Sequence, residues 1–167
     1  METAAHLHDS VRRTEDAVAE RNERVVLNKL IIMCRDAARG FEWATEHARD
    51  AELRAFFQQV ASTRHQYVME LLPHALWLGG VAPEGDGSRI AALHRAWMAV
   101  KDRLAPHHDH ALVVEAQRGE LAALATYDEA IKGDLPSEAQ RVVETQKSGI
   151  QEVCDRLPAF AATLLSA

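Results

Sequence analysis

Aromatic residues and cysteines are scarce in this sequence. Aromatic side chains make up 5% of the 167 residues, whereas alanine and leucine are abundant. This mixture favours helices that pack closely on small side chains. Cysteine occurs at Cys34 and Cys154, without the Cys-x-x-Cys spacing of metal and redox motifs. We therefore expect two buried thiols rather than a disulfide scaffold.

Long apolar runs are absent as well. No stretch approaches the roughly 18 apolar residues of a membrane-spanning helix, and the N-terminal segment METAAHLHDSVRRTEDAVAE lacks the apolar core of a signal peptide. The sequence therefore predicts a cytoplasmic protein that does not enter a membrane. The formal net charge of -6 argues against DNA or RNA as the main partner.

Motifs of covalent catalysis and nucleotide binding are also missing. The chain contains no Gly-x-Ser-x-Gly, and neither cysteine has a histidine close by on the same helical face. The segment GDGS follows no strand, so it predicts a turn and a helix cap rather than a phosphate loop. We expect no catalytic residue and favour a non-enzymatic protein.

What the sequence does contain is a helical period of apolar residues in four long segments. The expected helices cover about 24–48, 51–78, 109–132 and 137–165. Asp50 separates the first helix from the second, Gly133 ends the third, and Ser137 is suited to cap the fourth. No segment shows the alternating pattern of a strand.

Short turns make the first two helices one antiparallel hairpin and the last two another. The connection between the hairpins, residues 79–108, is long enough to run the length of the bundle and holds its own short helix after Ser88. This order predicts an all-α, ferritin-like four-helix bundle over residues 24–165. Residues 1–23 are polar, and we expect a mobile N-terminal arm or a short helix there.

Four segments carry a resemblance to a known family: LNKLIIMCRDAARGF, LWLGG, ALHRAWMAVK and QRGELAALATYDEAI. Over about residues 25–160 the chain resembles a bacterial family of four-helix-bundle proteins, a domain of unknown function in the ferritin-like superfamily. The resemblance implies a ferritin-like fold and little about activity, because the family is largely uncharacterised. A short internal repeat, DAARGF at 36–41 and EAQRGE at 115–120, is consistent with two copies of one hairpin.

Ferritin-like di-iron centres need a Glu from one helix of each hairpin and a Glu-x-x-His from the other. No histidine in this chain has an acidic residue three positions before it. In the internal repeat, Phe41 stands where the second copy has Glu120. The sequence therefore predicts that a complete di-iron centre is absent and that no cofactor is required.

A reduced iron or zinc site stays open as an alternative, and three groups of residues could supply it. The candidates are Glu120, Glu115 and Asp36 on the first and third helices, Glu70 and His74 on the second, and His107 and His110 where the crossover enters the third. The plainer interpretation of Glu70 and His74 is an exposed pair on one helical face. For the histidines it is a solvated loop in which Asp109 caps the third helix.

Two charged residues interrupt apolar stripes near the middle of their helices: Arg64 on the second and Glu120 on the third. We expect them to form a buried ion pair, because charged groups are seldom buried without a partner. Gln117 and Gln146 are expected to complete its hydrogen bonds. The role of such a pair would be to fix the register of the helices rather than to add much net stability.

The first interpretation of function is a structural, stress-related or interaction protein that lacks a complete di-iron site and forms a homodimer. Trp43, beside the inner stripe, could lie in that dimer contact. The alternative is a metal-binding protein with a reduced carboxylate site around Glu120. A third is a bundle that binds a small ligand in a gap among small residues. Those residues are Ala37, Ala38, Gly119 and Ala123.

Overall fold

The computed structural model describes residues 2–79 and 108–166, and every regular element in these ranges is a helix. The helices are α1 (Glu2–His47), α2 (Ala51–Trp77), α4 (His108–Ile131) and α5 (Ser137–Ser166). The predicted all-α four-helix bundle is therefore confirmed. The short helix expected after Ser88 lies outside the described residues. In the described ranges, no helix is long and apolar enough to cross a membrane.

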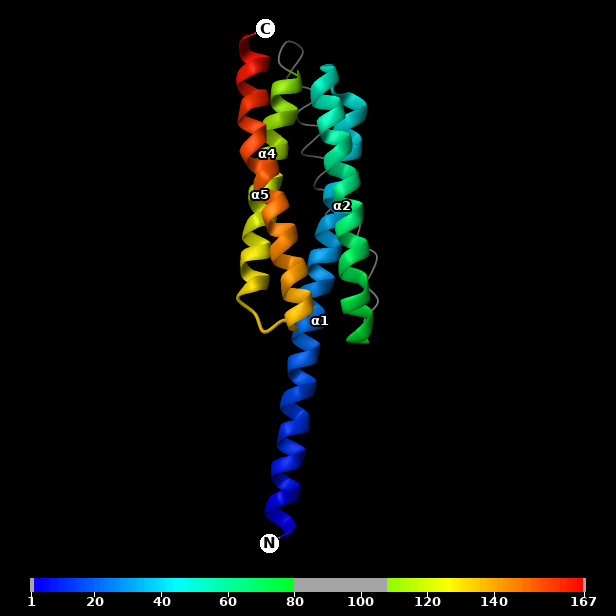
Figure 1. The fold of residues 1–167 in the computed structure, drawn as a ribbon, viewed down its shortest axis with the longest axis vertical. Coiled ribbons are helices and arrows are strands. Elements are labelled where there is room, and N and C mark those ends of the chain that lie inside the picture. The colour runs from blue at the N-terminus through cyan, green and yellow to red at the C-terminus, as the bar shows by residue number, and fades with distance from the viewer. Residues whose placement is uncertain (1, 80–107, 167) are drawn as a thin grey trace.

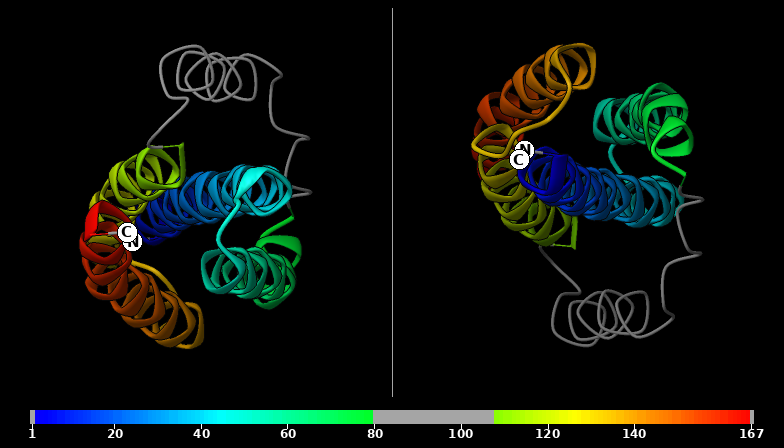
Figure 2. Two further views of the ribbon diagram at one scale, coloured as in Figure 1. Left: turned by 90° about the horizontal axis from the view of Figure 1, so that it is seen from above. Right: turned by 90° about the horizontal axis from the view of Figure 1, so that it is seen from below.

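The four helices form two antiparallel hairpins that lie side by side (Figure 1). α1 and α5 run in one direction and α2 and α4 in the other. Seen along its axis, the bundle has the order α1, α2, α5, α4 (Figure 2). Packing is closest within each hairpin, between α1 and α2 and between α4 and α5. As a result, α2 and α4 face each other across a diagonal of the bundle.

The start of the first helix differs from the prediction. The helix expected to begin near residue 24 begins at Glu2, and residues 2–23 continue α1 beyond the end of the bundle (Figure 1). This segment contains neither glycine nor proline, so no residue in it breaks a helix. The separate arm or short helix expected there is replaced by one helix of 46 residues. A domain boundary between 23 and 24 stays a prediction.

Asp109, in the first turn of α4, ties the two hairpins together at one end of the bundle. Its carboxylate accepts hydrogen bonds from the backbone N–H of Arg49, at 3.0 and 3.1 Å, and of Asp50, at 2.6 Å. Asp50 in turn caps α2, accepting from the N–H of Leu53 at 2.8 Å. The solvated loop expected around Asp109 is therefore wrong: Asp109 is buried and holds the α1–α2 turn.

Among residues 2–79 and 108–166, the apolar core forms two clusters, one towards each end of the bundle. The end near the α1–α2 turn is filled by one set: Phe41, Ala44, Ala48, Leu53, Phe56, Phe57, Val60, Ala61, Leu112, Val113, Ala116 and Leu157. The other set includes Leu27, Leu30, Ile31, Cys34, Tyr67, Val68, Leu71, Leu124, Tyr127, Val143 and Ile150. Polar side chains occupy the level between them, and this level is the candidate site.

Candidate functional site

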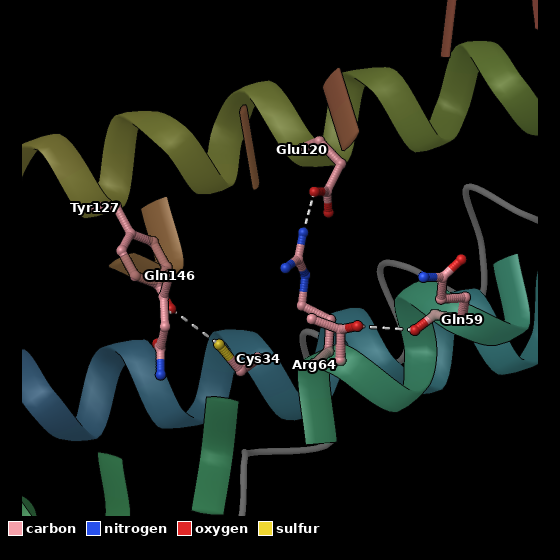
Figure 3. A network of polar contacts seen from close by, with 7 residues as sticks. Cys34, Gln59, Arg64, Glu120, Tyr127 and Gln146 are labelled. Atoms are coloured by element: carbon pink, nitrogen blue, oxygen red, sulfur yellow. Dashed lines mark hydrogen bonds and ion pairs between the residues drawn. The ribbon is translucent and has the colours of Figure 1, made fainter. Parts of the chain in front are cut away.

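Arg64 and Glu120 form an ion pair in the middle of the bundle (Figure 3). Arg64 projects from α2 between Val60 and Tyr67, and its Nη2 donates to Oε2 of Glu120 on α4. Their side chains are 1% and 2% exposed, so the pair is closed off from solvent. Burial raises the pKa of the Glu120 carboxyl, and the positive charge of Arg64 opposes that rise.

The remaining nitrogens of Arg64 lack hydrogen-bond partners in the described part of the chain. Nε and Nη1 are both buried. The guanidinium carbon lies 5.2 Å from the centre of the Tyr67 ring, a cation–π distance that gives part of the charge a favourable neighbour. Arg64 therefore presents only N–H donors and positive charge to the centre of the bundle.

A chain of hydrogen bonds beside this ion pair links all four helices. Figure 3 shows its part on α1, α4 and α5. The hydroxyl of Tyr127 on α4 donates to Oε1 of Gln146 on α5 at 2.7 Å. Because that uses the only hydroxyl proton, the thiol of Cys34 on α1 donates to Tyr127, at a sulfur–oxygen distance of 3.3 Å. Burial raises the pKa of the Cys34 thiol to about 11, so both groups stay protonated at neutral pH.

Gln146 extends the chain to α2. Its Nε2 donates to the backbone carbonyl of Tyr67 at 3.2 Å and to Oε2 of Glu70 at 2.9 Å. We expected Gln146 and Gln117 to complete the hydrogen bonds of the ion pair. Instead, Gln146 serves Tyr127 and α2, and Gln117 is half-buried and bonds to neither ion-pair member within the described residues.

Gly149 on α5 leaves the space that the Tyr67 side chain occupies. A methyl group on Gly149 would overlap the Tyr67 hydroxyl oxygen. A glycine on the inner face of a helix marks a close approach of another group, and here that group is the tyrosine stacked against Arg64. The close contact between α2 and α5 at this level depends on that glycine.

The carboxylates proposed for a reduced metal site are dispersed. Glu115 forms an ion pair with Arg118 on the surface of α4, including a 3.0 Å bond to Nε. Asp36 is half-buried on α1. Among the described residues, neither acid belongs to a group of three side chains that could hold a metal with Glu120. Both oxygens of Glu70 already accept hydrogen bonds, from Gln66 at 2.8 Å and from Gln146.

The described histidine candidates, His74 and His110, lie near helix ends. His74 is half-buried near the end of α2, and His110 is half-buried in the first turn of α4. His107 lies outside the described residues. Trp43, considered for a dimer contact, is half-buried and stacks on His47, with ring centres 3.8 Å apart. Of the small residues considered for a ligand gap, Gly119 is exposed, with open space where a side chain would start.

The donor set does not fit a di-metal centre. Within residues 2–79 and 108–166, no three His, Cys, Asp or Glu side chains converge as metal ligands. Among the described residues, Glu120 is the one buried carboxylate of the polar layer, and a guanidinium already neutralises it. Buried N–H donors of Arg64 would repel a cation placed beside them.

Two features of the polar level and one at the end of the bundle were not predicted from the sequence. They are the link from Gln146 to Glu70, the Gly149 notch that takes Tyr67, and the attachment of Asp109 to the α1–α2 turn. The close approach at Gly149 could have been suspected from the sequence, because a glycine there interrupts the inner stripe of an otherwise strong helix. The contact of Asp109 could not be predicted in this way, because its partners are backbone groups of the other hairpin.

Comparisons with known proteins agree with the fold. The fold is similar to a crystal structure of a two-domain protein from Anabaena variabilis with DJ-1/ThiJ/PfpI-like and ferritin-like domains. The TM-score is 0.70 at 14% sequence identity, covering 89% of this chain and 38% of that one. The likeness shows a ferritin-like fold. A search of the curated proteins gave no match. The model of a domain of unknown function, DUF2383, matches residues 22–133, so the chain belongs to the DUF2383 family.

Proposed function

We propose that this chain is a non-enzymatic ferritin-like bundle in which an ion pair stands in the place of a di-metal centre. The observation that carries the proposal is the position of Arg64, buried at mid-bundle and bonded to Glu120. A guanidinium is permanently charged and has no lone pair to give a metal. It supplies the positive charge that a carboxylate in this position needs.

The rest of the polar layer supports the same proposal. Cys34, Tyr127 and Gln146 use their polar atoms on one another and on α2. In the described part of the chain, no group of acids gathers there as metal ligands. A layer of this kind joins α1, α2, α4 and α5 at one level and resists sliding of one hairpin along the other. Fixing register is the best-attested role of buried polar groups in helical assemblies. The protein would then act as a structural, stress-related or interaction protein.

Metal binding is the alternative, and metal analysis separates the two. The purified chain is stripped with chelator, reloaded with Fe(II) or Zn(II), desalted and measured by elemental analysis. We expect less than one retained ion per chain, unchanged in Glu120→Ala. Retention of one or two ions that are lost in Glu120→Ala would overturn the proposal.

A matched variant guards against metal held at the surface. The chain carries histidines at His107, His108 and His110 that can collect zinc from solution. Metal that is lost in a His107→Ala/His110→Ala variant but kept in Glu120→Ala is bound by these histidines. It leaves the assignment of the central ion pair intact.

A further inference from the structure

The turn between α4 and α5 lies beside α1 where that helix leaves the bundle (Figure 1). A groove of about 530 Å³ opens between α1 and this turn. Clefts of this size are typical of small-molecule sites. Val18, Ala19 and Val26 of α1 and Leu135 of the turn supply its apolar lining. Val18 is 54% exposed, so an occupant of the groove would cover apolar surface that now faces solvent.

Three carboxylates also line the groove: Glu15 and Glu23 from α1 and Asp134 from the turn. Burial and the negative charges of Glu20 and Asp134 raise the pKa of Glu23, as expected where carboxylates crowd together. Among the residues that the structure describes, no basic side chain forms an ion pair with any of the three. The groove therefore carries negative charge without compensation, and this charge favours a cationic ligand.

The carboxylates of the groove are spread along α1 instead of gathered at one point. Glu15, Ala19 and Glu23 follow one another at four-residue steps and so form one ridge of the helix. At 1.5 Å per residue, Glu15 and Glu23 stand about 12 Å apart along its axis. Within residues 2–79 and 108–166, no three acidic, histidine or cysteine side chains converge to hold a metal ion. A compact cation would reach one end of the groove, whereas an extended one reaches both.

We propose that this groove binds a linear aliphatic diamine or polyamine. One terminal ammonium group pairs with Glu15, and the other pairs with Glu23 and Asp134. The methylene chain between them lies over Ala19 and Val18, which stand between the two acidic ends of the groove. Each part of such a ligand thus meets a matching part of the groove, with charge at the ends and apolar surface in the middle.

Charge and apolar surface together select this class of ligand. The three carboxylates would repel an anion, and an uncharged apolar molecule would leave them crowded and unpaired. A diamine supplies an ammonium group at each acidic end and removes the apolar surface between them from water. The formal net charge of -6 also attracts cations to the chain over longer distances.

The first test titrates the full chain at low salt with diaminooctane, which has an amine at each end, and follows amide chemical shifts by NMR. Exposed ion pairs with a small apolar contact predict a dissociation constant of about 1 mM, with shifts at Val18, Glu23 and Leu135. Diaminobutane should bind about fivefold more weakly, because it reaches only one end of the groove. Octanediol, which has the same chain without charge, should not bind. No shift at these amides, or equal affinity for the two diamines, would overturn the proposal.

The second test uses variants that keep their size and lose charge, with folding checked by circular dichroism. Glu23→Gln/Asp134→Asn should weaken diaminooctane binding by about tenfold. Glu15→Gln should abolish the preference for the longer diamine, because only one acidic end remains. Glu152→Gln is the matched control, since Glu152 is exposed on α5 and does not line the groove. Weakening by Glu152→Gln as large as that by Glu23→Gln/Asp134→Asn would show general attraction to an acidic chain and overturn the site.

Discussion

Arg64 and Glu120 are bonded across the diagonal of the bundle, from α2 of one hairpin to α4 of the other. Removing one partner leaves a buried charge without compensation, so Arg64→Met should lower the free energy of unfolding by about 3–5 kcal/mol. The measurement is urea unfolding followed by circular dichroism. An Arg64→Met variant with an unchanged unfolding midpoint would contradict a buried ion pair.

The matching double variant tests whether the cost comes from the stranded charge. Arg64→Met/Glu120→Leu replaces the pair by apolar side chains, which is often neutral or stabilising. We expect this variant to be more stable than either single variant, Arg64→Met or Glu120→Leu. Costs that simply add would show that the two side chains act independently.

Gly149→Ala should destabilise the bundle, because the added methyl group would overlap the hydroxyl of Tyr67. Overpacking of this kind costs about 1–3 kcal/mol. Gly119→Ala is the matched control: it lies mid-helix with nothing within 4 Å of the new methyl group, and should stabilise by about 0.5–1 kcal/mol. Thermal unfolding of both variants decides, and equal shifts would refute the close contact.

The Tyr67→Phe background sharpens that comparison. Removing the hydroxyl takes away the overlapping atom, so Gly149→Ala should cost much less in Tyr67→Phe than in the natural chain. A cost that is the same in both backgrounds would point to another cause, such as a shift of the α5 backbone.

Asp109→Ala should weaken the joint between the hairpins at one end. The variant leaves the backbone N–H groups of Arg49 and Asp50 without the carboxylate that they share. The loss of bonds to a charged acceptor should cost about 1.5–3 kcal/mol. Amide hydrogen exchange is the specific readout, because the N–H groups of Arg49 and Asp50 should exchange faster while those of α5 change little. Unchanged exchange at both positions would rule out the joint.

Alkaline pH should destabilise the protein partly through Cys34. Burial raises the pKa of this thiol from 9.0 to about 11, so the folded chain holds a proton that the unfolded chain releases. The free energy of unfolding therefore falls as the pH rises from 9 towards 11, by up to about 2.7 kcal/mol for this group. Urea unfolding at several pH values should show a shallower fall in Cys34→Ala. Parallel curves for the two proteins would contradict a buried, protonated thiol.

The helices within the bundle were predictable because residues with definite backbone preferences mark their ends. α2 was expected over 51–78 and covers Ala51–Trp77, since Asp50 caps it. The start of α1 was not predictable in the same way. Apolar periodicity reports which residues are buried, and it stops where α1 leaves the bundle, although the helix itself continues to Glu2. Because the stripe is absent there, we expected a mobile arm or a short helix instead of a continuation of α1.

The polar level was predictable only in part, for a related reason. Arg64 and Glu120 each interrupt an apolar stripe at mid-helix, so a mutual contact follows from their positions. The stripe also predicts that Gln146 points inward. Its hydrogen-bond partners do not follow from the stripe, because an amide group can both donate and accept and has several neighbours within reach. The rotation of α5 about its axis determines these partners. In the structure the amide oxygen of Gln146 lies near Tyr127 and its nitrogen near Glu70.

Because α1 is uninterrupted, residues 2–23 form a rigid spacer that extends beyond the bundle. At 1.5 Å per residue, the 20 or so residues before the bundle set a distance of about 30 Å between Glu2 and the bundle's end. A group attached ahead of Glu2 would be held at that distance and would turn with the helix, instead of sweeping the volume open to a flexible tether. A single glycine in the segment would be enough to turn this spacer into a hinge.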